Sequence, residues 1–184
     1  MIKIGNEYAT RKLFDSIKPG EGVPVIFPSM QPGAYFEEFI IKERTIGHKN
    51  PLKTFRAEEP IKLGTPKFDT LMGELNLRRE KGEDSTLSAV ITPDKTIWVL
   101  PMYFQDGAIS QHSIVARGNP CAWAGEVNIK GKEVLHMRDK SGHFRTLDFD
   151  EERQKDISDF ALQVFKGKGY NVPREIDLEK KRRV

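Results

Sequence analysis

The sequence predicts an α+β fold: a mostly antiparallel sheet of about five or six strands with helices packed on one side. Two observations lead to this fold. The stretch 86–138 contains two pairs of β-rich runs, and a turn signal joins the members of each pair. Segments with apolar residues at helical spacing come before and after it. A chain of 184 residues fits one compact domain, with a mixed helix and loop region (1–84) and a strand-rich region with a closing helix and charged tail (85–184).

The first part of the N-terminal region predicts three short elements and a long connection. Apolar residues at helical spacing indicate a helix over 6–17, and an apolar run predicts a strand at 23–27. The segment 34–43 has both aromatic and helical character, and we favour a helix. Residues 44–63 lack periodicity and predict a long exposed connection.

A stronger helix signal follows. Thr65 is a suitable N-cap and Pro66 suits the first turn, whereas Lys81 and Gly82 are typical of a helix end. The expected core side chains of this helix are Phe68, Leu71, Met72, Leu75 and Leu77.

Three β-rich runs come next. Residues 86–92 and 95–102 predict a hairpin, because Pro93 and Asp94 form a turn pair between them. Residues 110–115 predict a third short strand.

The clearest hairpin signal joins 122–129 to 133–138 through the turn 130–132. With the strand at 110–115, these two strands would form one meander. The expected core residues of the hairpin are Val127, Ile129, Val134 and Leu135.

The last predicted element is a helix that begins after Asp148 or Asp150 and runs to about Phe165. Gly167 and Gly169 supply the stop. Its expected buried stripe consists of Ile157, Phe160, Ala161, Val164 and Phe165.

Composition limits the protein class. The net charge of +3 permits an acidic partner or nucleic acid but does not require one. One cysteine excludes an intramolecular disulfide and a Cys-rich zinc site. We find no signal-peptide run, membrane-length segment or glycine-rich phosphate loop. We therefore expect a soluble, cytoplasmic protein without a membrane segment, cofactor or metal; export without a cleaved signal, as for an effector, would leave no trace here.

Three short motifs occur in order in the strand-rich region: His112-Ser113, Ala124-Gly125 and Ser141-Gly142-His143. In this order the chain resembles the conserved domain of plant IQ-motif calmodulin-binding proteins and of related fungal and bacterial proteins of unclear function. The resemblance covers roughly residues 86–166. It implies that these motifs belong together, but it does not supply a chemistry.

Several positions depart from the family pattern. Ile114 stands where the family has a second serine, Phe144 stands where it has tyrosine, and Thr146 falls near its proline. The IQ motif itself is missing from this sequence, so calmodulin binding is not implied.

The candidate catalytic residues are His112, Ser113, Ser141 and His143. Two imidazoles would serve as general base and general acid near neutral pH if the hairpin brings them together. On a strand, however, His112 and Ser113 would point to opposite faces unless the strand is irregular.

Three further residues are candidates for ligand binding. Arg117 or Arg145 would hold an anionic group such as phosphate, because a guanidinium matches such a group. Glu126 would orient a histidine or lie on the outer face.

Three function hypotheses remain open. The first is a small ligand-binding or catalytic domain with a paired His/Ser site that reads an anionic group. The second is a non-catalytic protein-interaction or regulatory module, in which the histidines pin loops and residues 44–63 form the partner surface. The third is a metal-independent endoribonuclease that uses His112 and His143 as base and acid.

Other chemistries fit less well. A Ser-His-Asp triad would need Asp106 or Asp139, and no nucleophile elbow is present. A zinc site with His136 would lack compact ligand spacing, and His136 is expected to point out from its strand. We interpret Cys121 as a small buried residue and Trp123 as part of the core.

Overall fold

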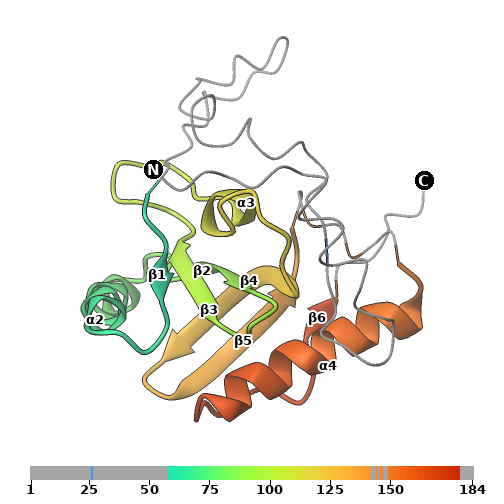
Figure 1. Ribbon diagram of the computed structural model, residues 1–184. Coiled ribbons are helices and arrows are strands. Elements are labelled where there is room, and N and C mark those ends of the chain that lie inside the picture. The colour runs from blue at the N-terminus through green and yellow to red at the C-terminus, as the bar shows by residue number, and fades with distance from the viewer. Residues whose placement is uncertain (1–25, 27–57, 142–143, 145, 147–148, 179–184) are drawn as a thin grey trace, which may run out of the picture.

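The computed structural model describes Ile26, residues 58–141, Phe144, Thr146 and residues 149–178 (Figure 1). The helices predicted at 6–17 and 34–43, and most of the predicted strand at 23–27, lie outside the described residues. Ile26 forms an isolated antiparallel bridge with Cys121.

The described residues form a six-stranded sheet with the strand order β1-β3-β2-β4-β5-β6. All neighbouring strands are antiparallel except β5 and β6, which are parallel. With three helices, this confirms the predicted α+β class and strand number. The elements are β1 (Ile61–Lys62), α2 (Pro66–Glu80), β2 (Leu87–Ile91), β3 (Ile97–Pro101), α3 (His112–Val115), β4 (Trp123–Lys130), β5 (Glu133–Asp139), α4 (Glu151–Gly167) and β6 (Asp177–Leu178).

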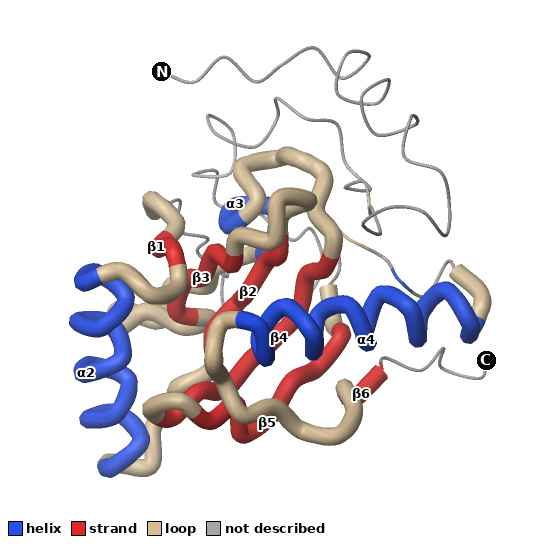
Figure 2. Tube along the Cα trace, turned by 60° about the horizontal axis from the view of Figure 1, so that its bottom comes forward, coloured by secondary structure: helices blue, strands red, loops and turns tan. Residues whose placement is uncertain are grey.

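The two faces of the sheet carry different helices. The Trp123 ring contacts Phe165 of α4, so α4 covers the face of β4 that carries Trp123. Ser88 hydrogen-bonds to Ser110, just before α3, and strand alternation places Ser88 on the opposite face from Trp123. We name these the α4 face and the α3 face. Figures 1 and 2 show α3 and α4 on opposite sides of the sheet, with α2 beside the β1 edge.

The predicted helix at 65–81 is confirmed as α2. The Thr65 hydroxyl accepts a hydrogen bond from the backbone N–H of Phe68 at 3.4 Å, which caps the first turn. Gly82 follows the helix with φ +73°, a conformation that glycine adopts without strain. Four of the five predicted core residues are buried, but the prediction for Leu77 is wrong, because its side chain is exposed to solvent.

The predicted connection 44–63 is wrong at its end, where β1 begins. Ile61 pairs with Val99 and Lys62 with Trp98, so β1 is an edge strand of the sheet. The backbone N–H of Leu63 extends the pairing by donating to the carbonyl of Ile97. This strand is only two residues long, and such a short strand has no periodicity to detect.

The predicted hairpin of β2 and β3 is confirmed, and Asp94 organises its turn. Oδ1 of Asp94 accepts hydrogen bonds from the Thr92 hydroxyl and the Thr96 backbone N–H, and Oδ2 accepts one from the Thr96 hydroxyl. The hydrogen bond from Thr92 contributes most to lowering the pKa of Asp94. The hydrogen bonds from Thr96 act in the same direction, whereas partial burial opposes them.

We expect the Asp94→Asn variant to be less stable than the wild type at neutral pH. The folded chain lowers the pKa of Asp94, so its ionised carboxylate stabilises the fold. This contribution is complete above the pKa that Asp94 has in the unfolded chain, and it is lost as the pH falls through the pKa that Asp94 has in the folded chain. The difference in melting temperature should therefore shrink between neutral pH and a pH of about 3. Glu83→Gln, which removes the same charge at an exposed position, is the control. A difference that stays constant with pH would contradict this role.

The strand predicted at 110–115 is wrong, because residues 112–115 form the helical turn α3. Gln111 is extended, and its carbonyl accepts hydrogen bonds from the N–H groups of Ile114 and Val115. The β-branched residues that favoured a strand are buried in the hydrophobic cluster, so tertiary packing overrides their propensity. The predicted meander is also wrong, since β4 pairs with β2 instead.

The hairpin of β4 and β5 is confirmed, with a bulge between Asn128 and Ile129. Val127, Ile129 and Val134 are buried as predicted, but Leu135 is exposed and is not a core residue. His136 points to solvent as expected, with 50% of its side chain exposed.

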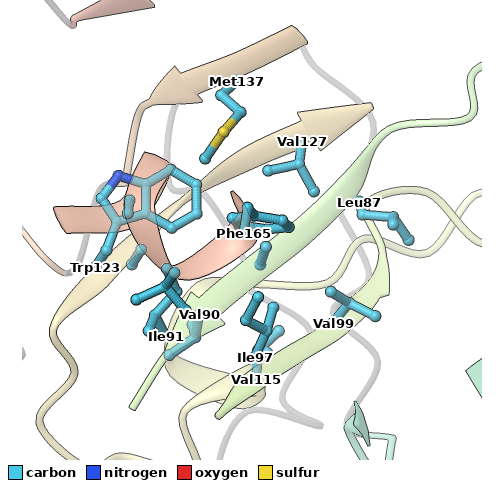
Figure 3. Packing of buried hydrophobic residues seen from close by; sticks show 14 of the residues in the cluster. Leu87, Val90, Ile91, Ile97, Val99, Val115, Trp123, Val127, Met137 and Phe165 are labelled. Carbon is cyan, nitrogen blue, oxygen red and sulfur yellow. The ribbon is translucent and has the colours of Figure 1, made fainter. Parts of the chain in front are cut away.

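The predicted C-terminal helix is confirmed as α4, and Asp150 is its N-cap through a 2.8 Å hydrogen bond from the Arg153 N–H. The predicted stripe is buried except for Phe160, which is partly buried. Phe165 packs edge-on against Trp123 at 6.5 Å and against Tyr170 at 6.2 Å between ring centroids. Figure 3 shows Phe165 and Trp123 beside Met137 and Val127 of the hairpin. Among the described residues, no helix combines the length and apolarity that a membrane span requires.

Candidate functional site

The first predicted corner, His112-Ser113, lies on α3, and both residues are buried. Consecutive residues of a helix differ by roughly 100° in direction, rather than the half-turn of a strand. His112 and Ser113 therefore do not point to opposite faces, as they would on a strand. The backbone carbonyls of both residues accept hydrogen bonds, from the N–H groups of Ala116 and Gly118, and hold the turn together.

The second predicted corner begins at Ser141, immediately after β5. Ser141 is buried, and its hydroxyl accepts a hydrogen bond from the backbone N–H of Phe144 at 3.1 Å. This bond closes a local turn, so Ser141 has a structural task there. His143 and Arg145 lie outside the described residues. The pairing of His112 with His143, and the nuclease hypothesis that needs it, stay predictions.

Arg117 lies just after α3 in a left-handed conformation, with φ 54°. Its guanidinium forms an ion pair and hydrogen bond with Glu59, in the segment before β1. Arg117 therefore ties the end of α3 to that segment, and an anionic ligand at this guanidinium would compete with the Glu59 carboxylate.

Glu126 of β4 lies on the α3 face with only 10% of its side chain exposed. Arg138, its direct partner on β5, places Nη1 3.6 Å from Oε2 of Glu126. Lys140 places Nζ 3.7 Å from Oε1. A nearly buried carboxylate thus lies between two basic side chains, which is a favourable arrangement for a carboxylate that has lost most of its water.

Asp177 of β6 extends this arrangement on the other side of Arg138. Its Oδ2 lies 3.3 Å from Nε of Arg138, with which it forms a hydrogen bond, and 3.9 Å from Nε2 of His136. We name Glu126, His136, Arg138, Lys140 and Asp177 the Glu126 cluster.

A pair of buried serines connects the Glu126 cluster to the first predicted corner. Ser88 of β2 is the direct cross-strand partner of Glu126, and its hydroxyl accepts a 2.9 Å hydrogen bond from the Ser110 hydroxyl. Ser110 stands two residues before His112. The fold therefore brings the predicted ligand-binding residue Glu126 and the predicted corner at His112 to the same face of the sheet.

Sequence reasoning missed Arg138, Lys140 and Asp177 as site residues. One signal was available: residues 136, 138 and 140 are all basic and alternate with other residues along the predicted strand 133–138 and just beyond its end. Such alternation indicates one face with several cations. The signal for Asp177 was absent, because β6 is only two residues long.

Cys121 and Trp123 belong to the interior, as expected. Burial raises the pKa of the Cys121 thiol well above its usual value, and the negative charge of Asp139 raises it further. The thiol is therefore protonated at neutral pH and is a poor nucleophile. Within the described part of the chain, no group of three or more His, Cys, Asp and Glu side chains could hold a metal ion.

Two open hollows lie on the described surface, away from the Glu126 cluster. One, of about 300 Å³, lies between α4 and the β2–β3 turn, where Lys95 and Phe160 line it. The other, of about 350 Å³, lies between α2 and the end of β3, where Leu71 and Pro101 line it. None of the candidate site residues lines either hollow.

The chain matches no known family model, and comparisons with the curated proteins and with the solved structures found no match. The resemblance to the plant IQ-motif proteins therefore stays a prediction.

Proposed function

We propose that this domain binds a small ligand through an anionic group of the phosphate type, at the Glu126 cluster. One observation carries the proposal. Arg138 and Lys140 lie beside each other with 41% and 49% of their side chains exposed, and one nearly buried carboxylate, Glu126, pairs with both of them.

The geometry leaves donors for a ligand. The separations of 3.6 and 3.7 Å from the Glu126 oxygens are longer than those of close charge-assisted hydrogen bonds, which are about 2.7–2.9 Å. A guanidinium has five N–H donors and an ammonium has three, so each group can also bind an oxyanion from the solvent side. Glu126 holds the two cations near each other before the ligand arrives, which reduces the entropy lost on binding.

The charge balance of the Glu126 cluster predicts modest affinity. Two cations face two carboxylates, so the cluster is close to neutral when His136 is uncharged. The ligand would gain from direct hydrogen bonds rather than from a strong positive field.

Other parts of the chain contribute less to this choice among the hypotheses. The nuclease hypothesis needs His143, which is outside the described residues. The interaction-module hypothesis places its partner surface on residues 44–63, of which 44–57 are also outside the described residues. Both depend on positions outside the described residues.

The first hypothesis named Arg117 or Arg145 as the anion-binding residue. Arg117 pairs with Glu59 and Arg145 lies outside the described residues, so the proposed site replaces them with Arg138 and Lys140, which are both described.

We expect Arg138→Ala to weaken binding of inorganic pyrophosphate about tenfold or more, because a hydrogen bond to a charged group contributes about 1.5–3 kcal/mol. Lys140→Ala should weaken it by a smaller factor, because an ammonium is a point charge without the guanidinium fork. Titration of ¹⁵N-labelled protein with pyrophosphate, followed at the backbone amide signals of Glu126 and Asp139 in the wild type and in each variant, measures the dissociation constants directly.

The control for this titration is Lys155→Ala, which removes an exposed cation from α4. Melting temperatures of all variants test whether they fold. Equal affinities of the Arg138→Ala and Lys155→Ala variants, or a wild-type signal that does not respond to pyrophosphate, would show that the cluster is not an anion site.

A further inference from the structure

We infer that Asp177 is a built-in competitor for the anion site: its carboxylate binds Arg138 when no ligand is present, and an arriving oxyanion displaces it together with β6. This inference rests on the proposed function, because it concerns the regulation of the same site.

The position of Asp177 matches that of a bound anion. One oxygen, Oδ2, accepts a hydrogen bond from Nε of Arg138 at 3.3 Å and also approaches Nε2 of His136 at 3.9 Å. A carboxylate offers the same kind of acceptor oxygens as a phosphate, and a guanidinium binds either of them. Asp177 therefore uses a donor that the ligand would use.

Within the described residues, the strand that carries Asp177 is held by few interactions. β6 consists of two residues and pairs with β5 only at Arg138 and Asp139, in the parallel direction. The Asp177 side chain is 56% exposed, so its ion pair with Arg138 is a solvent-screened one. Such pairs stabilise only weakly, so a ligand with additional oxygens can displace the carboxylate.

The residue before β6 supplies an anchor. Ile176 is buried in the hydrophobic cluster, whereas Asp177 is exposed. Release of β6 would therefore leave the preceding chain in place and would move only the pairing residues. The competition is local and does not require the domain to unfold.

The test compares two variants that change the net charge equally. Asp177→Asn removes the competing carboxylate, and Glu175→Gln removes an exposed carboxylate two residues earlier in the same segment. We expect Asp177→Asn to tighten inorganic pyrophosphate binding about two- to fivefold, the range that a solvent-screened ion pair allows. Glu175→Gln should change it by less than about half of that factor.

A second readout follows the displacement itself. In the wild type, pyrophosphate should shift the backbone amide signals of Asp177 and Leu178 at the same concentrations that shift the Arg138 Nε–Hε signal. Asp177→Ala removes the carboxylate without leaving an amide in its place, and it should tighten binding as Asp177→Asn does.

The outcomes separate the inference from the proposed function. If Asp177→Asn and Glu175→Gln tighten binding equally, the effect is one of net charge, and the inference fails while the anion site stands. If Asp177→Asn and Asp177→Ala weaken binding, Asp177 positions Arg138 for the ligand and does not compete. If neither the wild type nor any of these variants binds pyrophosphate, the proposed function and the inference both fail.

Discussion

Gly125→Ala is expected to destabilise the domain by about 3 kcal/mol or more, at the upper end of the cost of overpacking a core. A Cβ at this position would lie 2.3 Å from the backbone carbonyl oxygen of Arg138 and 2.3 Å from Cζ2 of Trp123. Neither neighbour can move easily. The carbonyl belongs to the paired strand β5, and the Trp123 side chain is fully buried and packs against Phe165.

Urea unfolding of the wild type and of Gly125→Ala measures the change, and Gly73→Ala is the matched control. A Cβ on Gly73, in the middle of α2, would meet nothing within 4 Å. Alanine favours a helix over glycine by about 1 kcal/mol, so this control should be as stable as the wild type or slightly more stable. Wild-type stability of Gly125→Ala would mean that the Trp123 ring does not cover this glycine as described.

The same contact gives the Ala124-Gly125 motif a physical explanation. The absence of a side chain at Gly125 lets the Trp123 ring lie across β4, where it fills the space under α4. In this chain the motif therefore serves packing. Of the residues on which the resemblance to the plant IQ-motif proteins depends, this pair belongs to the scaffold and Ser141 to a turn. His112 follows Ser110, whose hydroxyl donates to Ser88, the cross-strand neighbour of Glu126.

Local chemistry predicted the elements whose signals are local. The sequence placed the Thr65 cap and the Pro93-Asp94 turn correctly, and it named Asp150 as one of two candidate caps of the last helix. The position of β4 beside β2 depends on packing between segments that are distant along the chain. The periodicity of a single segment contains no information about such a partner, so the predicted meander was wrong.

The bulge in the β4–β5 hairpin is the reason that the Glu126 cluster could not be predicted from the sequence. The pairs Lys130–Glu133 and Ile129–Val134 set one register near the turn. If that register continued without a bulge, Met137 would lie opposite Glu126. The bulge shifts the pairing by one residue, so that Arg138 lies opposite Glu126 instead. The predicted turn 130–132 would pair Ile129 with Glu133 and place His136 opposite Glu126. The sequence therefore could not place Arg138 beside this carboxylate, because no local signal identifies the bulge.

Phe165→Ala is expected to destabilise the domain by about 3–5 kcal/mol, the usual cost of truncating a buried aromatic side chain. Phe165 is fully buried and joins two aromatic contacts: its ring meets Trp123 at an interplanar angle of 89° and Tyr170 at 85°. Its removal would leave a cavity between β4 and α4 and would remove one ring contact of Tyr170, which lies in the connection from α4 to β6.

Phe160→Ala on the same helix is the control, because Phe160 is only partly buried and lines an open hollow that water can fill. Urea unfolding should give a loss several times larger for Phe165→Ala than for Phe160→Ala. Equal losses would contradict the central position of Phe165. Because the segment from Tyr170 leads to Asp177, the Phe165→Ala variant should also weaken the β5–β6 pairing, and hydrogen exchange at the Leu178 amide should be faster than in Phe160→Ala.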